Sequence, residues 1–143
     1  MDRLFDVPGT DLLKVLTVRQ PWASLIVSGM KSIENRNWTT SFRGRLLIHA
    51  GKTIEQTEWN EMFDALPTGA ILGSVDVVDV VRDSTSEWAE ADSFHWILAN
   101  AIEFDSSIPA TGKLGLWNVT DPETLDAISR EIDYSVELTA AEA

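Results

Sequence analysis

A long run of β-forming residues in the middle of the chain constrains the fold more than any other feature. Residues 70–82 are rich in valine and contain no proline, which is typical of a long β-strand. Gly73 interrupts the run and predicts a bulge or bend within it. A strand of this length needs partners for its backbone groups, so the chain is predicted to build a sheet around it.

Shorter segments on both sides of this run supply the remaining elements. Apolar or alternating stretches bounded by turn residues predict further strands at residues 14–19, 32–38, 44–51, 94–99 and 113–119. Helical spacing, with Gly29 as a C-terminal cap, predicts helices at residues 21–28, 53–66 and from 122 onward. These elements predict an α+β domain, a curled sheet or barrel of five to six strands with two to three flanking helices.

The chain divides into three parts by composition. Residues 1–13 are an N-terminal extension, and residues 14–119 contain all the predicted strands. Residues 120–143 are acidic and predict a C-terminal helix or tail, with one apolar face formed by Leu125, Ile128 and Ile132.

Composition also excludes several kinds of site. The chain has no cysteine and only two histidines, so disulfides and cysteine-bound metals are excluded, and we expect neither a metal site nor a cofactor. The first residues carry charges and no apolar run, and no apolar stretch is long enough to span a bilayer. We therefore expect a cytoplasmic protein without membrane contact. The sequence leaves the oligomeric state open.

The charges are distributed unevenly along the chain. The net charge is −12, which by itself argues against nucleic acid as a partner. Residues 14–52, however, contain seven basic residues and a single acid, Glu34. A locally positive cleft in an acidic protein can still bind an anion, so the basic segment is the candidate binding region.

Lys31, Glu34 and Arg36 form the sharpest candidate site. Lys31 follows the predicted helix end, and Glu34 and Arg36 are two residues apart on a predicted strand, so they face the same side. Glu34 could accept from the exocyclic amine of a base while the two cations hold carbonyl or phosphate oxygens. Alternatively, Arg36 could lower the pKa of Lys31 and make it a general base. An edge-strand salt bridge without a function is the third interpretation.

Six tryptophans are unusual in a chain of 143 residues. Apolar surroundings predict core positions for Trp59, Trp96 and Trp117. Trp22 and Trp38 lie in the basic segment, where an aromatic face beside cations could stack on a base, and the alternative is that both pack in the core.

Several motifs in order resemble one known family. Residues 16–38 and 43–50 resemble the ASCH family, the homology domain of a transcriptional cointegrator. Its signature, Gly-x-Lys-x-x-Glu-x-Arg, is met by Gly29, Lys31, Glu34 and Arg36. Later segments at 69–73 and 112–117 also match, so the resemblance covers roughly residues 15–119 and identifies 14–119 as an ASCH domain.

The resemblance implies a fold similar to the PUA domain, with a cleft at the motif and RNA-related binding. Some members resemble amidohydrolases that deacetylate N4-acetylcytidine, with a lysine paired to a threonine nucleophile three residues later and a distal glutamate. Lys31 matches that lysine, but Glu34 occupies the threonine position. Ser32 is a candidate substitute nucleophile, and Glu87 or Glu90 is a candidate for the glutamate.

We therefore expect a module that binds a nucleobase or nucleotide of RNA, or a modified nucleoside, in a cleft formed by the motif. The expected ligand contacts are Trp22, Arg36 and Trp38 at the base, and Arg43, Arg45 and Lys52 at phosphates. The alternative is an enzyme, an N4-acetylcytidine amidohydrolase or a ribonuclease, with Lys31, Glu34 and Ser32 as catalytic residues. In the ribonuclease variant His49 would be the acid or base. A third hypothesis has the acidic remainder of the chain docking a basic protein partner.

Overall fold

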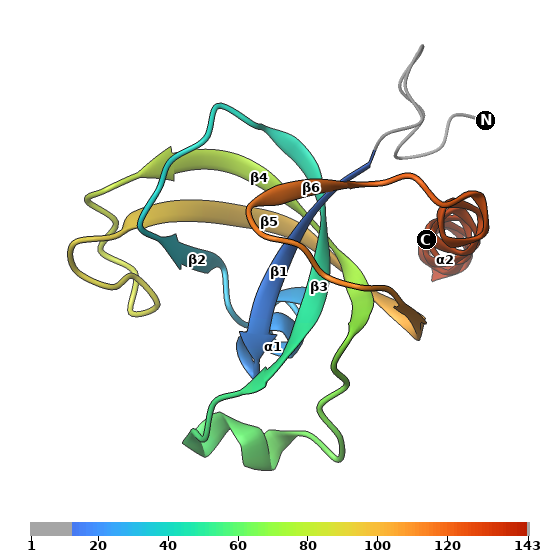
Figure 1. Ribbon diagram of the computed structural model, residues 1–143, viewed down its shortest axis with the longest axis horizontal. Coiled ribbons are helices and arrows are strands. Elements are labelled where there is room, and N and C mark those ends of the chain that lie inside the picture. Colours follow the sequence, from blue (N-terminus) through green and yellow to red (C-terminus); the bar gives the residue numbers. More distant parts are fainter. Residues whose placement is uncertain (1–12, 143) are drawn as a thin grey trace.

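One six-stranded sheet organises the molecule (Figure 1). The structure is a computed structural model that describes residues 13–142, with side chains described through residue 135. Apart from Leu13, the predicted N-terminal extension at 1–13 lies outside the described residues. The strands are β1 (Leu13–Gln20), β2 (Ile33–Arg36), β3 (Gly44–Ile54), β4 (Ala70–Val81), β5 (Phe94–Pro109) and β6 (Leu116–Val119).

The strands lie in the order β2-β5-β4-β3-β1-β6. β1 and β3 run parallel, and every other neighbouring pair is antiparallel. The sheet curls without closing into a barrel, because β2 and β6 at its two ends do not pair with each other (Figure 1). The predicted α+β class and six-stranded curled sheet are therefore confirmed, and the barrel alternative is replaced by an open sheet.

Two helices pack on this sheet over two apolar clusters. α1 (Trp22–Val27) buries all of its residues except Trp22, and Gly29 just beyond its end has a φ of +87°, the left-handed cap predicted from the sequence. α2 (Pro122–Glu142) buries Ile128 and Ile132 in the second cluster, which also contains Phe104 and Ile108 of β5. Among the described residues, neither helix has the length and apolar content needed to cross a bilayer.

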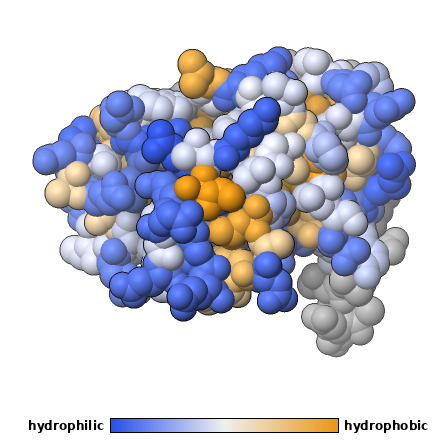
Figure 2. Space-filling view, turned by 60° about the horizontal axis from the view of Figure 1, so that its bottom comes forward, coloured by the Kyte–Doolittle hydropathy of each residue, from blue (hydrophilic) through white to orange (hydrophobic). Residues whose placement is uncertain are grey.

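The helix predicted at residues 53–66 is wrong. β3 continues to Ile54, and only a short 3-10 helix, η1 (Glu58–Met62), follows. The hydroxyl of Thr57 accepts from the backbone of Trp59, and the side chain of Asn60 accepts from the backbone of Thr57, so a capping box fixes this start. The apolar residues that the helical spacing was expected to bury are half-buried or exposed, namely Ile54, Trp59, Met62, Phe63 and Leu66. Figure 2 turns the lower side of the molecule in Figure 1 forward and shows an apolar area near the middle of that side, bordered by hydrophilic residues.

The curl of the sheet depends on a close approach between β4 and β5. The pairing of these strands shifts register on both sides of Gly73, as the predicted bulge requires. An ideal Cβ on Gly73 would lie 2.1 Å from the carbonyl oxygen of Ile102 in β5. No other residue fits at this position without moving the backbone.

We predict that Gly73→Ala destabilises the fold by about 1–3 kcal/mol, because the added methyl pushes β5 away from β4. Urea denaturation followed by circular dichroism measures the free energy of unfolding. Val78→Ala, at an exposed position of the same strand, is the control and changes that free energy by less than about 0.5 kcal/mol. Wild-type stability of Gly73→Ala would show that the approach of the strands is not a constraint.

Candidate functional site

A cleft of about 870 Å³ opens beside β2. Its walls come from β1, α1, β2, the end of β3, the 82–93 segment and the segment that precedes β6. Most of the residues predicted to form the site line this cleft, namely Trp22, Lys31, Glu34, Arg36, Trp38 and Lys52. The cleft is called the motif cleft below.

Lys31, Glu34 and Arg36 form one connected network at the base of the motif cleft. The Arg36 Nε donates to Glu34 Oε2 at 2.8 Å, and the Lys31 Nζ lies 3.6 Å from Glu34 Oε1. Arg36 also donates through its terminal nitrogen to the Thr17 carbonyl of β1 at 2.8 Å, while Lys31 donates to the Ile33 carbonyl. Lys31 and Glu34 are only 5% and 7% exposed, so this is no surface ion pair. Arg36 retains donors that face the cleft.

Burial sets the acidity of Lys31. Removal from water lowers the pKa of the Lys31 ammonium, and this effect outweighs the opposing attraction of Glu34. Arg36, which one of the alternative hypotheses invoked for a lowered pKa of Lys31, is the smallest of the causes. The direction of the pKa is therefore as expected, but its principal cause is desolvation.

Aromatic rings flank the buried ammonium on two sides. The Lys31 Nζ is 5.9 Å from the ring centroid of Trp22 and also 5.9 Å from that of Trp88. The Trp22 ring is oriented by its Nε1, which donates to Glu55 Oε2 at 2.5 Å. Trp38 packs edge-on against the buried Trp96, with ring centroids 4.9 Å apart. Two of these rings were expected in the site, and Trp88 was not.

Trp88 enters the site because the 82–93 segment is tied to β2. Asn35 donates to the Trp88 carbonyl at 2.9 Å and accepts from the Glu90 backbone at 2.9 Å. The buried His95 ring accepts from the Ser84 backbone and contacts the Glu90 carbonyl at 2.7 Å, so its second nitrogen carries a proton. The only sequence signal for Trp88 was a lone tryptophan in an otherwise polar connection. Trp59, predicted in the core, instead packs half-buried on Trp88 at a centroid distance of 5.1 Å.

Three predicted site residues lie outside the motif cleft. Ser32 precedes β2, is exposed and does not line the cleft. Arg43 and Arg45 also do not line it. A terminal nitrogen of Arg43 lies 3.6 Å from Asp79 Oδ1, and the Arg45 Nε lies 3.2 Å from Asp76 Oδ1.

The charges lining the motif cleft nearly balance. Its basic residues are Arg19, Lys31, Arg36, Lys52 and Lys113, and its carboxylates are Glu34, Glu55, Glu87 and Glu90. The excess of positive charge expected from residues 14–52 is therefore offset by acids that the fold brings in from later in the chain. Among residues 13–135, no three His, Asp or Glu side chains are grouped to hold a metal ion.

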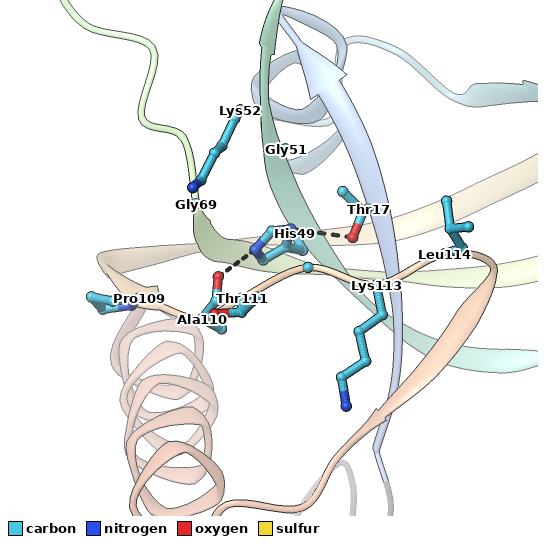
Figure 3. Close-up of a pocket in the computed structure, with 11 residues that line it drawn as sticks. Thr17, His49, Gly51, Lys52, Gly69, Pro109, Ala110, Thr111, Lys113 and Leu114 are labelled. Carbon is cyan, nitrogen blue, oxygen red and sulfur yellow. Dashed lines mark hydrogen bonds between the residues drawn. The ribbon is translucent and has the colours of Figure 1, made fainter.

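A second hollow of about 760 Å³ adjoins the motif cleft (Figure 3). His49 of β3 lies beside it, 2% exposed, with its Nε2 2.7 Å from the Ala110 carbonyl, which can only accept. The other ring nitrogen, Nδ1, therefore accepts from the Thr17 hydroxyl, 3.2 Å away. That hydroxyl in turn accepts from Trp117 Nε1 at 3.1 Å. Burial lowers the pKa of His49, which keeps the ring neutral.

The open six-stranded sheet and the cleft at its β2 edge define the class of protein, and the chain belongs to the ASCH domain family. The family model, ASCH domain, matches residues 16–108. Among curated proteins, the chain is 32% identical over 126 residues to Activating signal cointegrator 1 of Mus musculus and to that of Homo sapiens, matching 73% of this chain. The match spans only 22% of the length of those relatives.

Solved structures agree with this assignment at the level of the fold. The crystal structure of ASCH from Zymomonas mobilis superposes with a TM-score of 0.55 at 15% identity, covering 81% of this chain and 93% of that one. A serine-to-alanine mutant of the same Zymomonas mobilis protein gives a TM-score of 0.55 at 16% identity, covering 82% of this chain and 94% of that one. The recognition made from the motif is thereby confirmed.

We predict that His49 makes the fold sensitive to mild acid. Below the ordinary histidine pKa of 6.5, the unfolded chain binds a proton that the folded protein, with its lowered pKa, does not. The free energy of unfolding therefore falls as pH drops from 6.5 toward the lowered pKa. Urea denaturation at about pH 7.5 and about pH 5.5 measures this loss, and His49→Gln, which cannot be protonated there, shows a smaller one. Equal losses in both proteins would contradict this role.

Proposed function

We propose that this ASCH domain binds a nucleobase or nucleotide of RNA, or a modified nucleoside, in the motif cleft. The observation that carries the proposal is the network of Lys31, Glu34 and Arg36, two of them almost fully buried, at the base of a tryptophan-lined cleft. Buried charges destabilise a fold unless they are well paired, and hydrophobic replacements are often as stable. Their retention in a cleft supports a ligand-binding role.

The chemistry of the network suits the edge of a base. Glu34 presents acceptors for an exocyclic amine, and the unused donors of Arg36 suit a carbonyl oxygen. Trp22 and Trp88, which flank Lys31, supply apolar faces on which a base can stack. Lys52 is the expected phosphate contact that also lines the cleft. Arg43 and Arg45 were expected at phosphates too, but they are engaged by Asp79 and Asp76 outside it.

We predict that Lys31→Ala and Arg36→Ala each weaken nucleoside binding at least about tenfold, or about 1.4 kcal/mol, because each loses charged hydrogen bonds to the ligand. The four common ribonucleosides and N4-acetylcytidine serve as probes, and titration calorimetry measures affinity. Lys31→Met preserves the buried stem and guards against unfolding, which circular dichroism checks. Arg130→Ala, exposed on α2, is the control and binds like wild type. Wild-type affinity in both cleft variants would refute the assignment.

A second candidate function is hydrolysis of the amide of N4-acetylcytidine, and the lowered pKa of Lys31 favours it. A neutral lysine can take a proton from water as that water attacks the acetyl carbonyl. As the C–N bond breaks, the Lys31 ammonium returns that proton to the leaving nitrogen, and the products are cytidine and acetic acid, which ionises to acetate. With Glu34 in place of the threonine nucleophile, attack by water is the simplest route, and exposed Ser32 is not needed for it.

We predict for this enzyme that turnover rises with pH as Lys31 loses its proton, and that Lys31→Ala abolishes it. Chromatography for cytidine, after incubation of excess protein with N4-acetylcytidine, measures the reaction. Glu34→Gln, which removes the charge opposite Lys31, alters the pH profile rather than the fold. No cytidine release by the wild-type protein would leave the binding function alone.

A further inference from the structure

The motif cleft and the second hollow adjoin each other. They share five lining residues, namely Thr17, Gly51, Lys52, Lys113 and Leu114. Each space is about as large as a pocket for one drug-sized ligand, which typically measures about 300–1,000 Å³. A single nucleotide bound at Lys31 would therefore leave the second hollow empty.

Charge distinguishes the two spaces. Both spaces are lined by Lys52 and Lys113. The motif cleft also has four glutamates in its lining, whereas the second hollow has no carboxylate. Neither lysine forms an ion pair with any residue between 13 and 135. Two such lysines at the junction of the spaces favour a negatively charged group there.

The segment that carries Lys113 is held firmly in place. His49 bonds to the Ala110 carbonyl, and the Ala110 backbone donates to the Gly69 carbonyl at 3.0 Å. Gly112 lies so close to His49 that an added Cβ would be 2.8 Å from the ring. Leu114 is 98% exposed at the rim, so its side chain adds almost nothing to folding and offers a free apolar surface. In Figure 3 the side chains of Lys52 and Lys113 extend in different directions from the segments around this hollow, and Leu114 lies next to Lys113 in the chain.

We infer that the second hollow is a subsite for the nucleotide next to the one in the motif cleft, so that the ligand is a single-stranded RNA segment of at least two nucleotides. The flexible side chains of Lys52 and Lys113, which line both spaces, are the contacts for the linking phosphate, and the second base packs on Leu114. This inference rests on the proposed function of the motif cleft. It adds Lys113 and Leu114 to the binding residues.

The test compares three kinds of probe by titration calorimetry: a ribonucleoside, its 5′-monophosphate, and the 3′,5′-dinucleotide of the same base, for each of the four common bases. We expect the dinucleotide to bind at least about tenfold more tightly than the nucleoside, through charged hydrogen bonds at the phosphate and added apolar contact. Lys113→Ala removes most of this gain and Leu114→Ala removes part of it, so each variant lowers dinucleotide affinity more than it lowers nucleoside affinity. Arg130→Ala is the matched control.

The outcomes separate the two proposals. A dinucleotide that binds no more tightly than the nucleoside overturns the subsite, and so does a gain that Lys113→Ala leaves intact. A 5′-monophosphate that reproduces the whole gain shows an anion site without room for a second base, which also overturns it. Failure of the proposed function looks different, because then no nucleoside binds, or Lys31→Ala binds like wild type.

Discussion

Both hollows depend on the parallel register of β1 and β3. This register sets Thr17 opposite His49, in the middle of the sheet. The Thr17 carbonyl receives Arg36 from the motif cleft, and the Thr17 hydroxyl joins His49 to Trp117 beside the second hollow. One residue of one strand therefore connects both networks. A one-residue slip between the strands would turn Thr17 to the opposite face and separate them.

The motif cleft contains buried charges, which are unfavourable for the stability of a fold. Lys31 and Glu34 are buried charges, and removing such charges from water opposes folding unless they are well paired. The rest of the sheet buries apolar residues instead: those of β1, β3 and β4 fill two clusters beneath the helices. Local conflict with the rules of a good core is typical of functional positions in proteins.

The sequence predicted the features that depend on neighbours along the chain. The shared face of Glu34 and Arg36 follows from strand pleating, and the cap at Gly29 follows from helix chemistry. Features that depend on distant partners escaped prediction. Trp88 joins the site only because Asn35 holds its segment against β2, and Arg45 faces Asp76 only through the register of β3 and β4. The apolar spacing at 53–66 predicted a helix. Ile54 instead pairs with β1, and a pattern of neighbouring residues does not reveal this pairing with a distant strand.

The position of α2 has a consequence for how the domain should be delimited. The family match ends at residue 108, whereas β6 and α2 follow it along the chain. β6 covers the outer edge of β1, and α2 covers Phe104 and Ile108. A fragment cut at residue 108 would present an unpaired strand edge beside uncovered apolar surface, and both features favour self-association. The sheet and the helix that covers it therefore extend beyond the segment that the family model matches.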